Sequence, residues 1–267
     1  MNKMDRALHE LREMDDLAAL DSPIHRLCPL AKLLTTIAYI LAVVSFRKYD
    51  LTALAVMVLW PVLLFQISGV PVRTCFYKLR FVLPLVMAVG VFNPLFDRQI
   101  IFTLGRVPVS GGVVSMLTLM LKGVLCLMAS FLLMATTSID AVCAALRKLR
   151  VPGMLVTLLL LTYRYVGIMT EELAVMTDAY HLRAPGQKGI HISAWGSFLG
   201  QLLLRSMDRA QELYSSMQLR GYHEHFHYAQ TPPCTGKDAA YALGCAAGFL
   251  LLRTVNAAEL LGGLLVR

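Results

Sequence analysis

The stretch from Val113 to Met134 is an apolar run that contains one charged side chain, Lys122. About 20 apolar residues are enough for a helix to cross a bilayer, so this run can span a membrane alone. Four further apolar runs cover Leu30–Phe46, Leu51–Ile67, Phe81–Phe96 and Ala239–Leu252. The 267-residue chain is 57% hydrophobic and only 16% charged, which is more apolar than a soluble domain of this size. These features predict an all-α polytopic membrane protein with about five transmembrane helices.

The positions of the apolar runs divide the chain into four parts. The expected parts are a cytoplasmic N-terminal segment (1–30), four transmembrane helices (31–135), a cytoplasmic helical domain (136–237) and a C-terminal transmembrane helix (238–267). Lysine and arginine are concentrated in the first and third parts. The positive-inside rule therefore places both of these parts in the cytoplasm.

The sequence also predicts the structure of three stretches that lie between or beside the apolar runs. Residues 68–80, "SGVPVRTCFYKLR", are predicted to form a basic loop, and residues 97–112 form a polar excursion that allows a small hairpin. Residues 152–170 are apolar enough to span the membrane, but they include Arg164, which is costly at the bilayer centre. A long helix lying along the cytoplasmic interface is favoured there, and a true span is the alternative.

The charge and the cysteines exclude some classes of protein. The formal net charge of +8 is interpreted as cytoplasmic loops that face anionic membrane lipid, and nucleic acid is not expected as a partner. The six cysteines are scattered and include no C-x-x-C pair. They are therefore expected to be small buried apolar residues, and neither a disulfide framework nor a zinc site is predicted.

Two helical patterns in the cytoplasmic domain end in the same way, at "TDAYHLRAP" (177–185) and "SSMQLRGY" (215–222). In each pattern an arginine continues an apolar stripe at offsets i, i+3, i+7 and i+10. The stripes consist of Leu173, Met176, Tyr180 and Arg183, and of Ala210, Leu213, Met217 and Arg220. One such arginine is explained by the helix macrodipole. Two matching copies favour docking, because a guanidinium offers a planar fork to a partner's carboxylate or carbonyl groups.

Two other features carry weaker hypotheses. Lys122 lies near the middle of an apolar run, and an intramembrane charge suggests an interface with a partner subunit. His223, His225 and His227 share one face if "GYHEHFHY" is extended, and imidazole suits nickel, cobalt or zinc. A solvated polar loop is the favoured reading of these histidines, so no metal site is assigned and they are weak candidates.

The chain resembles the transmembrane T components of energy-coupling factor transporters, and most closely their cobalt/nickel branch, the CbiQ family. The resemblance extends over nearly the whole chain and rests on the order and spacing of five segments. These segments are "SPIHRLCPLAKLL", "TTSIDAVCAALRKLRVP", "LTYRYVGIMTEEL", "HLRA" and "QLRG". The family's motif is commonly Ala-Arg-Gly. This chain has Leu182 and Leu219 in place of alanine and Ala184 in place of one glycine.

The resemblance implies a cytoplasmic platform of three coupling helices, of which the two arginine-bearing ends dock into grooves of two ABC-type ATPase subunits. The docking residues that it implies are Leu182, Arg183, Ala184, Leu219, Arg220 and Gly221. It also implies that the chain holds a small substrate-binding membrane subunit, which reorients when the ATPases close. The expected location is the plasma membrane of a prokaryote. Cobalt or nickel is the expected cargo, and a vitamin importer is the alternative.

The chain itself is not expected to be an enzyme or to bind a cofactor. The stretch "CTGKD" (234–238) lacks the first glycine and the Ser or Thr of a phosphate-binding loop, so ATPase activity is expected in the partners. An intramembrane enzyme would need facing acid/base or metal-binding groups within its spans. A stand-alone carrier would favour paired halves with interrupted helices. The sequence shows neither pattern, and both readings stay as alternatives from a different class.

Overall fold

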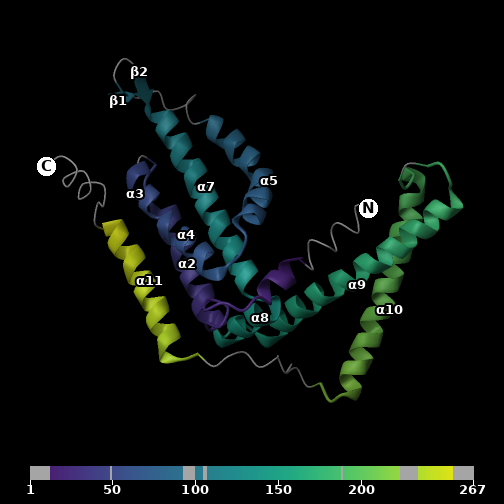
Figure 1. The fold of residues 1–267 in the computed structure, drawn as a ribbon. Coiled ribbons are helices and arrows are strands. Elements are labelled where there is room, and N and C mark those ends of the chain that lie inside the picture. The colour runs from purple at the N-terminus through teal and green to yellow at the C-terminus, as the bar shows by residue number, and fades with distance from the viewer. Residues whose placement is uncertain are drawn as a thin grey trace. The chain divides into compact units, whose positions relative to one another are not determined.

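The computed structural model describes residues 13–48, 50–92, 100–104, 107–187, 189–222 and 234–254 (Figure 1). The chain divides into two compact units. The bundle unit comprises Leu17–Ser138 and Thr231–Arg267, and it contains all five apolar runs. The arginine unit comprises Met1–Asp16 and Ile139–Gln230, and it contains both arginine motifs.

The described part of the bundle unit consists of helices and one small hairpin. Its helices are α2 (Pro29–Ser45), α3 (Leu51–Val56), α4 (Leu59–Ser68), α5 (Val72–Val91), α7 (Gly111–Thr136) and α11 (Gly236–Thr254). The hairpin pairs β1 (Ile100–Leu104) with β2 (Val107–Ser110) in antiparallel register. Each apolar run of the sequence thus contributes to a helix, and the polar excursion does contain a hairpin.

The basic stretch 68–80 is mainly helical, so the prediction of a loop there was wrong. Gly69 ends α4 in the left-handed region at φ +69°, and Pro71 caps the start of α5. The turn is therefore completed within a few residues, and α5 continues through Pro84 to Val91. The helix packs closely on α7, because a Cβ on Gly123 would lie 3.2 Å from the Val86 side chain.

An aromatic cluster forms the centre of the bundle unit. Tyr39 is fully buried, its ring stacks on Trp60 at 4.4 Å, and it meets Phe249 of α11 edge-on. The Tyr39 hydroxyl donates to the carbonyl of Met57 at 2.9 Å. Met57 lies between α3 and α4, so this bond satisfies a backbone acceptor where the predicted single run Leu51–Ile67 breaks into two helices.

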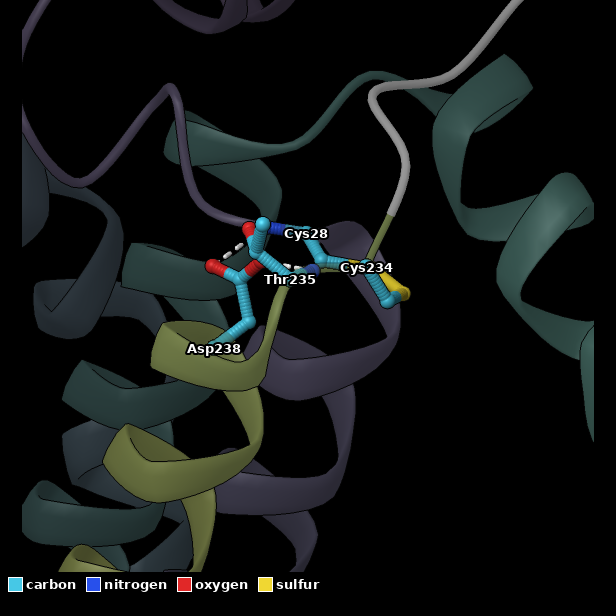
Figure 2. Close-up of a disulfide and its surroundings, with 4 residues drawn as sticks. All are labelled: Cys28, Cys234, Thr235 and Asp238. Atoms are coloured by element: carbon cyan, nitrogen blue, oxygen red, sulfur yellow. Dashed lines mark hydrogen bonds between the residues drawn. A yellow bond between two sulfur atoms is a disulfide. The ribbon is translucent and has the colours of Figure 1, made fainter.

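A disulfide joins Cys28, at the start of α2, to Cys234, just before α11 (Figure 2). The expectation that the cysteines form no disulfide was therefore wrong for this pair. The two residues are separated by 206 positions but their Cα atoms lie 5.2 Å apart, and such proximity cannot be read from sequence spacing. The other four, Cys75, Cys126, Cys143 and Cys245, are free and at least half-buried, as predicted.

The arginine unit is built from helices α8 (Ile139–Lys148), α9 (Gly153–Arg183) and α10 (Trp195–Leu219), with a short 3-10 helix at Ile192–Ala194. α8 packs on the start of α9 through Cys143, Val156 and Leu160. Residues 152–170 therefore lie at the start of one continuous helix that ends at the first arginine motif. Among the described helices, α7 and α9 are long and apolar enough to cross a membrane. The number of spans, and the placement of α9 along the interface, stay predictions.

Candidate functional site

Both arginine motifs lie at the C-terminal end of a helix, as the stripes predict. Arg220 caps α10, and the chain then turns in a Schellman motif. The Tyr222 N–H donates to the Met217 carbonyl at 3.0 Å, and the Gly221 N–H donates to the Gln218 carbonyl at 2.9 Å. Gly221 has φ +75°, a conformation that side-chain-bearing residues rarely adopt. The glycine of this motif is therefore required by the turn itself.

The end of α9 is built differently, because Ala184 replaces the glycine. Ala184 has φ −127°, and its N–H donates to the Tyr180 carbonyl at 3.0 Å. The Tyr180 hydroxyl donates to Gln187 Oε1 at 2.9 Å and accepts from the His191 N–H at 3.2 Å. Tyr180 therefore fixes the turn that follows Arg183, a role that its place in an apolar stripe did not indicate.

The residues at the two helix ends are presented to solvent. Leu182 is 84% exposed and Leu219 is 90% exposed. Arg183 and Arg220 are also exposed, and neither side chain forms an ion pair or a hydrogen bond with another residue that the structure describes. Each tip thus combines a large apolar side chain with an uncommitted guanidinium. These are the side-chain types that anchor protein interfaces.

The stripe residues behind the tips are more covered than the tips. Leu173, Met176, Tyr180, Leu213 and Met217 are half-buried, and Ala210 is exposed. Their contribution to docking stays a prediction. In the structure, the first stripe and Arg183 lie on α9, and the second stripe lies on α10, which ends at Arg220.

α9 and α10 contact each other through an ion pair between Glu172 and Arg205. The same two residues help to line an open groove of about 270 Å³ between the helices. α10 has 25 residues, so its length places Arg220 roughly 37 Å from Trp195, the first residue of that helix. The sequence contains both charges of the ion pair, but it does not show which turns of the two helices meet.

Lys122 projects from α7 to the C-terminal end of α2. Its Nζ donates to the carbonyl of Phe46 at 2.5 Å and to that of Val44 at 3.1 Å. The last carbonyls of a helix lack partners within the helix and carry partial negative charge, so an ammonium group is favourable there. The predicted interface with a partner subunit is not tested by these contacts and stays a prediction.

A metal site is not apparent in the described residues, where no cluster of three His, Cys, Asp or Glu side chains occurs. The weak candidates His223, His225 and His227 lie outside the described residues.

Comparison with known proteins places the chain in a family. The CbiQ family, described as cobalt transport protein, matches residues 21–230. The cobalt transport protein CbiQ of Rhodobacter capsulatus is 32% identical over 137 residues, which cover 50% of this chain and 52% of that protein. The energy-coupling factor transporter transmembrane protein EcfT of Limosilactobacillus fermentum is 24% identical over 224 residues, which cover 76% of this chain and 81% of that protein.

A third relative is the nickel permease LarQ of Lactiplantibacillus plantarum, which is 29% identical over 91 residues, or 34% of this chain and 33% of that protein. The alignments with the first and third relatives thus span about half and a third of those proteins. The family match covers most of this chain and includes both arginine motifs. The chain therefore belongs to the CbiQ cobalt transport protein family.

Proposed function

We propose that the chain is the transmembrane coupling subunit of an energy-coupling factor importer in a prokaryotic plasma membrane. The observation that carries this proposal is the pair of exposed arginine tips at the ends of α9 and α10. The names of the relatives from Rhodobacter and Limosilactobacillus support it, because one is a cobalt transport protein and the other an energy-coupling factor transmembrane protein.

The tips suit docking to two separate partners. Each has one exposed leucine and one arginine without an intramolecular partner among the described residues. The leucine can fill an apolar groove, and the guanidinium can bind carboxylate or carbonyl groups at its edge. Because the length of α10 separates Arg220 from the turn after Arg183, one groove does not have to hold both tips. Two ABC-type ATPase subunits would each receive one tip.

In this mechanism the partners supply the energy and this chain transmits it. ATP binding closes the two ATPases and moves the tips that they hold. The movement passes along α9 and α10 to the bundle unit, which holds a small substrate-binding membrane subunit. That subunit then changes its orientation and releases its substrate into the cell.

Cobalt or nickel is the proposed cargo. The support is the family description, cobalt transport protein, together with the nickel permease among the relatives. Recognition of the ion is assigned to the substrate-binding subunit. A vitamin importer is the second candidate, because the EcfT relative's name specifies no substrate. Uptake assays with labelled cobalt, nickel and vitamins distinguish these cargoes.

Charge reversal at the tips tests the proposed docking. Arg183→Glu combined with Arg220→Glu should lower co-purification of the ATPases at least about tenfold, because interface anchors contribute about 2 kcal/mol or more. The bundle unit should stay folded, since both side chains are exposed and belong to the arginine unit.

The control is Arg150→Glu, which makes the charge change of one tip substitution at an exposed residue in the α8–α9 turn. This variant should bind the ATPases as the wild type does. Docking by the tips is disproved if the double variant retains its ATPases and its transport activity.

A further inference from the structure

The chain passes between its two units at three places, after Asp16, after Ser138 and after Gln230. A single short segment of the bundle unit, Ser22–Lys32, contacts the bundle side of the first two crossings and also Cys234, the first described residue after the third. We call this segment the collar. Its contacts lie entirely within the bundle unit and are described one crossing at a time.

His25 links the first two crossings. Its Nε2 lies 3.2 Å from the carbonyl of Leu17, the first residue of the bundle unit, and 3.3 Å from the carbonyl of Ala135 near the end of α7. Carbonyls only accept hydrogen bonds, so Nε2 carries the proton. The other ring nitrogen, Nδ1, forms a hydrogen bond of 2.7 Å with Ser22 Oγ. Both ring nitrogens of His25 are thus held by hydrogen bonds.

Lys32 holds the second crossing directly. Its side chain is buried, and its Nζ donates to the carbonyl of Thr136 at 2.6 Å and to that of His25 at 3.3 Å. Thr136 is the last residue of α7, so the ammonium compensates the negative end of that helix. A buried charge is costly unless such partners are present, which ties the position of Lys32 to the end of α7.

Cys28 holds the chain at the first described residue after the third crossing (Figure 2). Cys28 is disulfide-bonded to Cys234, the first described residue after that crossing. The Cys28 N–H also donates to Asp238 Oδ1 at 3.3 Å, while Asp238 Oδ2 accepts from the N–H and the hydroxyl of Thr235 at 2.8 and 2.7 Å. The start of α11 is therefore fixed to the start of α2.

The second crossing has one more distinctive feature. Thr137 lies between the held end of α7 and the start of α8, and its hydroxyl is buried without a hydrogen-bond partner among the described residues. Unpaired buried polar groups are rare and costly in native structures, and they call for an explanation. The junction between the end of α7 and the start of α8 thus leaves one buried hydroxyl unsatisfied among the described residues.

We propose that His25 and Lys32 are positioning residues that transmit movement of the arginine unit to the bundle unit. This inference rests on the proposed coupling function. α8 follows α7 along the chain, so a displacement of α8 shifts the end of α7. Because His25 and Lys32 are hydrogen-bonded to the last carbonyls of α7, this shift also displaces the collar and the start of α2. Without these two contacts, the end of α7 can move independently of the collar. ATP hydrolysis is then no longer converted into transport.

The test measures substrate transported per ATP hydrolysed in the complete reconstituted complex. The variants are Lys32→Met, which keeps the length of the side chain but removes its donors, and His25→Ala. Both should retain bound ATPases and ATP hydrolysis but lower the transport ratio at least about fivefold, the lower end of measured couplings between sites. His25→Gln, which can restore a donor near Nε2, should recover most of the ratio.

The matched control is Tyr39→Phe, which also removes a buried donor to a backbone carbonyl but lies away from the crossings. It should lower thermal stability and leave the transport ratio unchanged. The inference is overturned if Lys32→Met and His25→Ala keep the wild-type ratio, or if Tyr39→Phe lowers it equally. If Lys32→Met does not assemble, the comparison of His25→Ala with His25→Gln decides. Failure of the proposed function itself would differ, because the wild-type chain would then bind no ATPase.

Discussion

At the scale of single residues, each of the helices α2 and α7 places a lysine at the C-terminal end of the other. Lys32 of α2 donates to the last carbonyl of α7, and Lys122 of α7 donates to the last carbonyls of α2. The sequence marks Lys122 as unusual because its neighbours are apolar. Lys32 does not stand out in the sequence, because it lies near the edge of an apolar run. Its partner, the C-terminal end of α7, is more than a hundred residues away along the chain.

Replacement of Lys122 by methionine separates a structural role from an interface role. Lys122→Met leaves the α2 carbonyls unpaired, so the free energy of unfolding should fall by about 1.5–3 kcal/mol, the usual contribution of a charged donor. Thermal unfolding in detergent measures this change, and Lys122→Arg should recover part of it. An unchanged stability together with loss of the substrate-binding subunit would instead support the predicted interface.

The cysteine pair gives a second test at this scale. Mild oxidation should link the peptides that contain Cys28 and Cys234, and mass spectrometry without reductant detects the link. Cys143 is the internal control. Burial, and then the neighbouring Asp140, raises the pKa of its thiol, which keeps it protonated and unreactive. Failure to detect the link, with Cys234 free to alkylation, would show that the ends of α2 and α11 are not held together.

At the scale of elements, the apolar runs could be predicted because length and composition suffice to define them. The cores of α2 and α7 match their runs, and both arginines were correctly expected at helix ends. The helix over residues 72–80 was missed because Gly69 and Pro71 were interpreted as part of a longer basic loop. In the structure Gly69 ends α4 and Pro71 caps the start of α5, so the loop is confined to the residues between the two helices. The contacts of the collar were missed because each joins distant segments.

The turn after α10 allows a test of whether the backbone geometry at the Arg220 tip matters for docking. Gly221→Ala forces a side chain into φ +75°, which costs about 1–2 kcal/mol and should weaken ATPase binding roughly five- to thirtyfold. Gly196→Ala is the matched control, because Gly196 lies in the helical part of α10 and an added Cβ meets nothing within 4 Å. Equal binding affinities for the two variants would show that the geometry of this turn does not matter for docking.

At the scale of the whole molecule, the proposal requires both tips on the cytoplasmic side of the membrane. Leu182→Cys and Leu219→Cys, each compared with its parent chain and produced without the ATPases that would cover the tips, should react with a membrane-impermeant maleimide in inverted vesicles and not in intact spheroplasts. Both positions are highly exposed, so accessibility depends on the side of the membrane. Labelling of Leu182→Cys in intact spheroplasts would show that α9 crosses the bilayer, and the predicted interfacial placement of residues 152–170 would be wrong.

ATP-driven uptake of labelled cobalt into proteoliposomes tests the coupling role most directly. The complete complex should accumulate the ion only with ATP. The Arg183→Glu, Arg220→Glu variant should bind cobalt at the substrate-binding subunit but fail to accumulate it. Accumulation by this variant at the wild-type rate, or uptake by the chain without ATPases, would contradict the proposal that the chain couples ATP hydrolysis to transport.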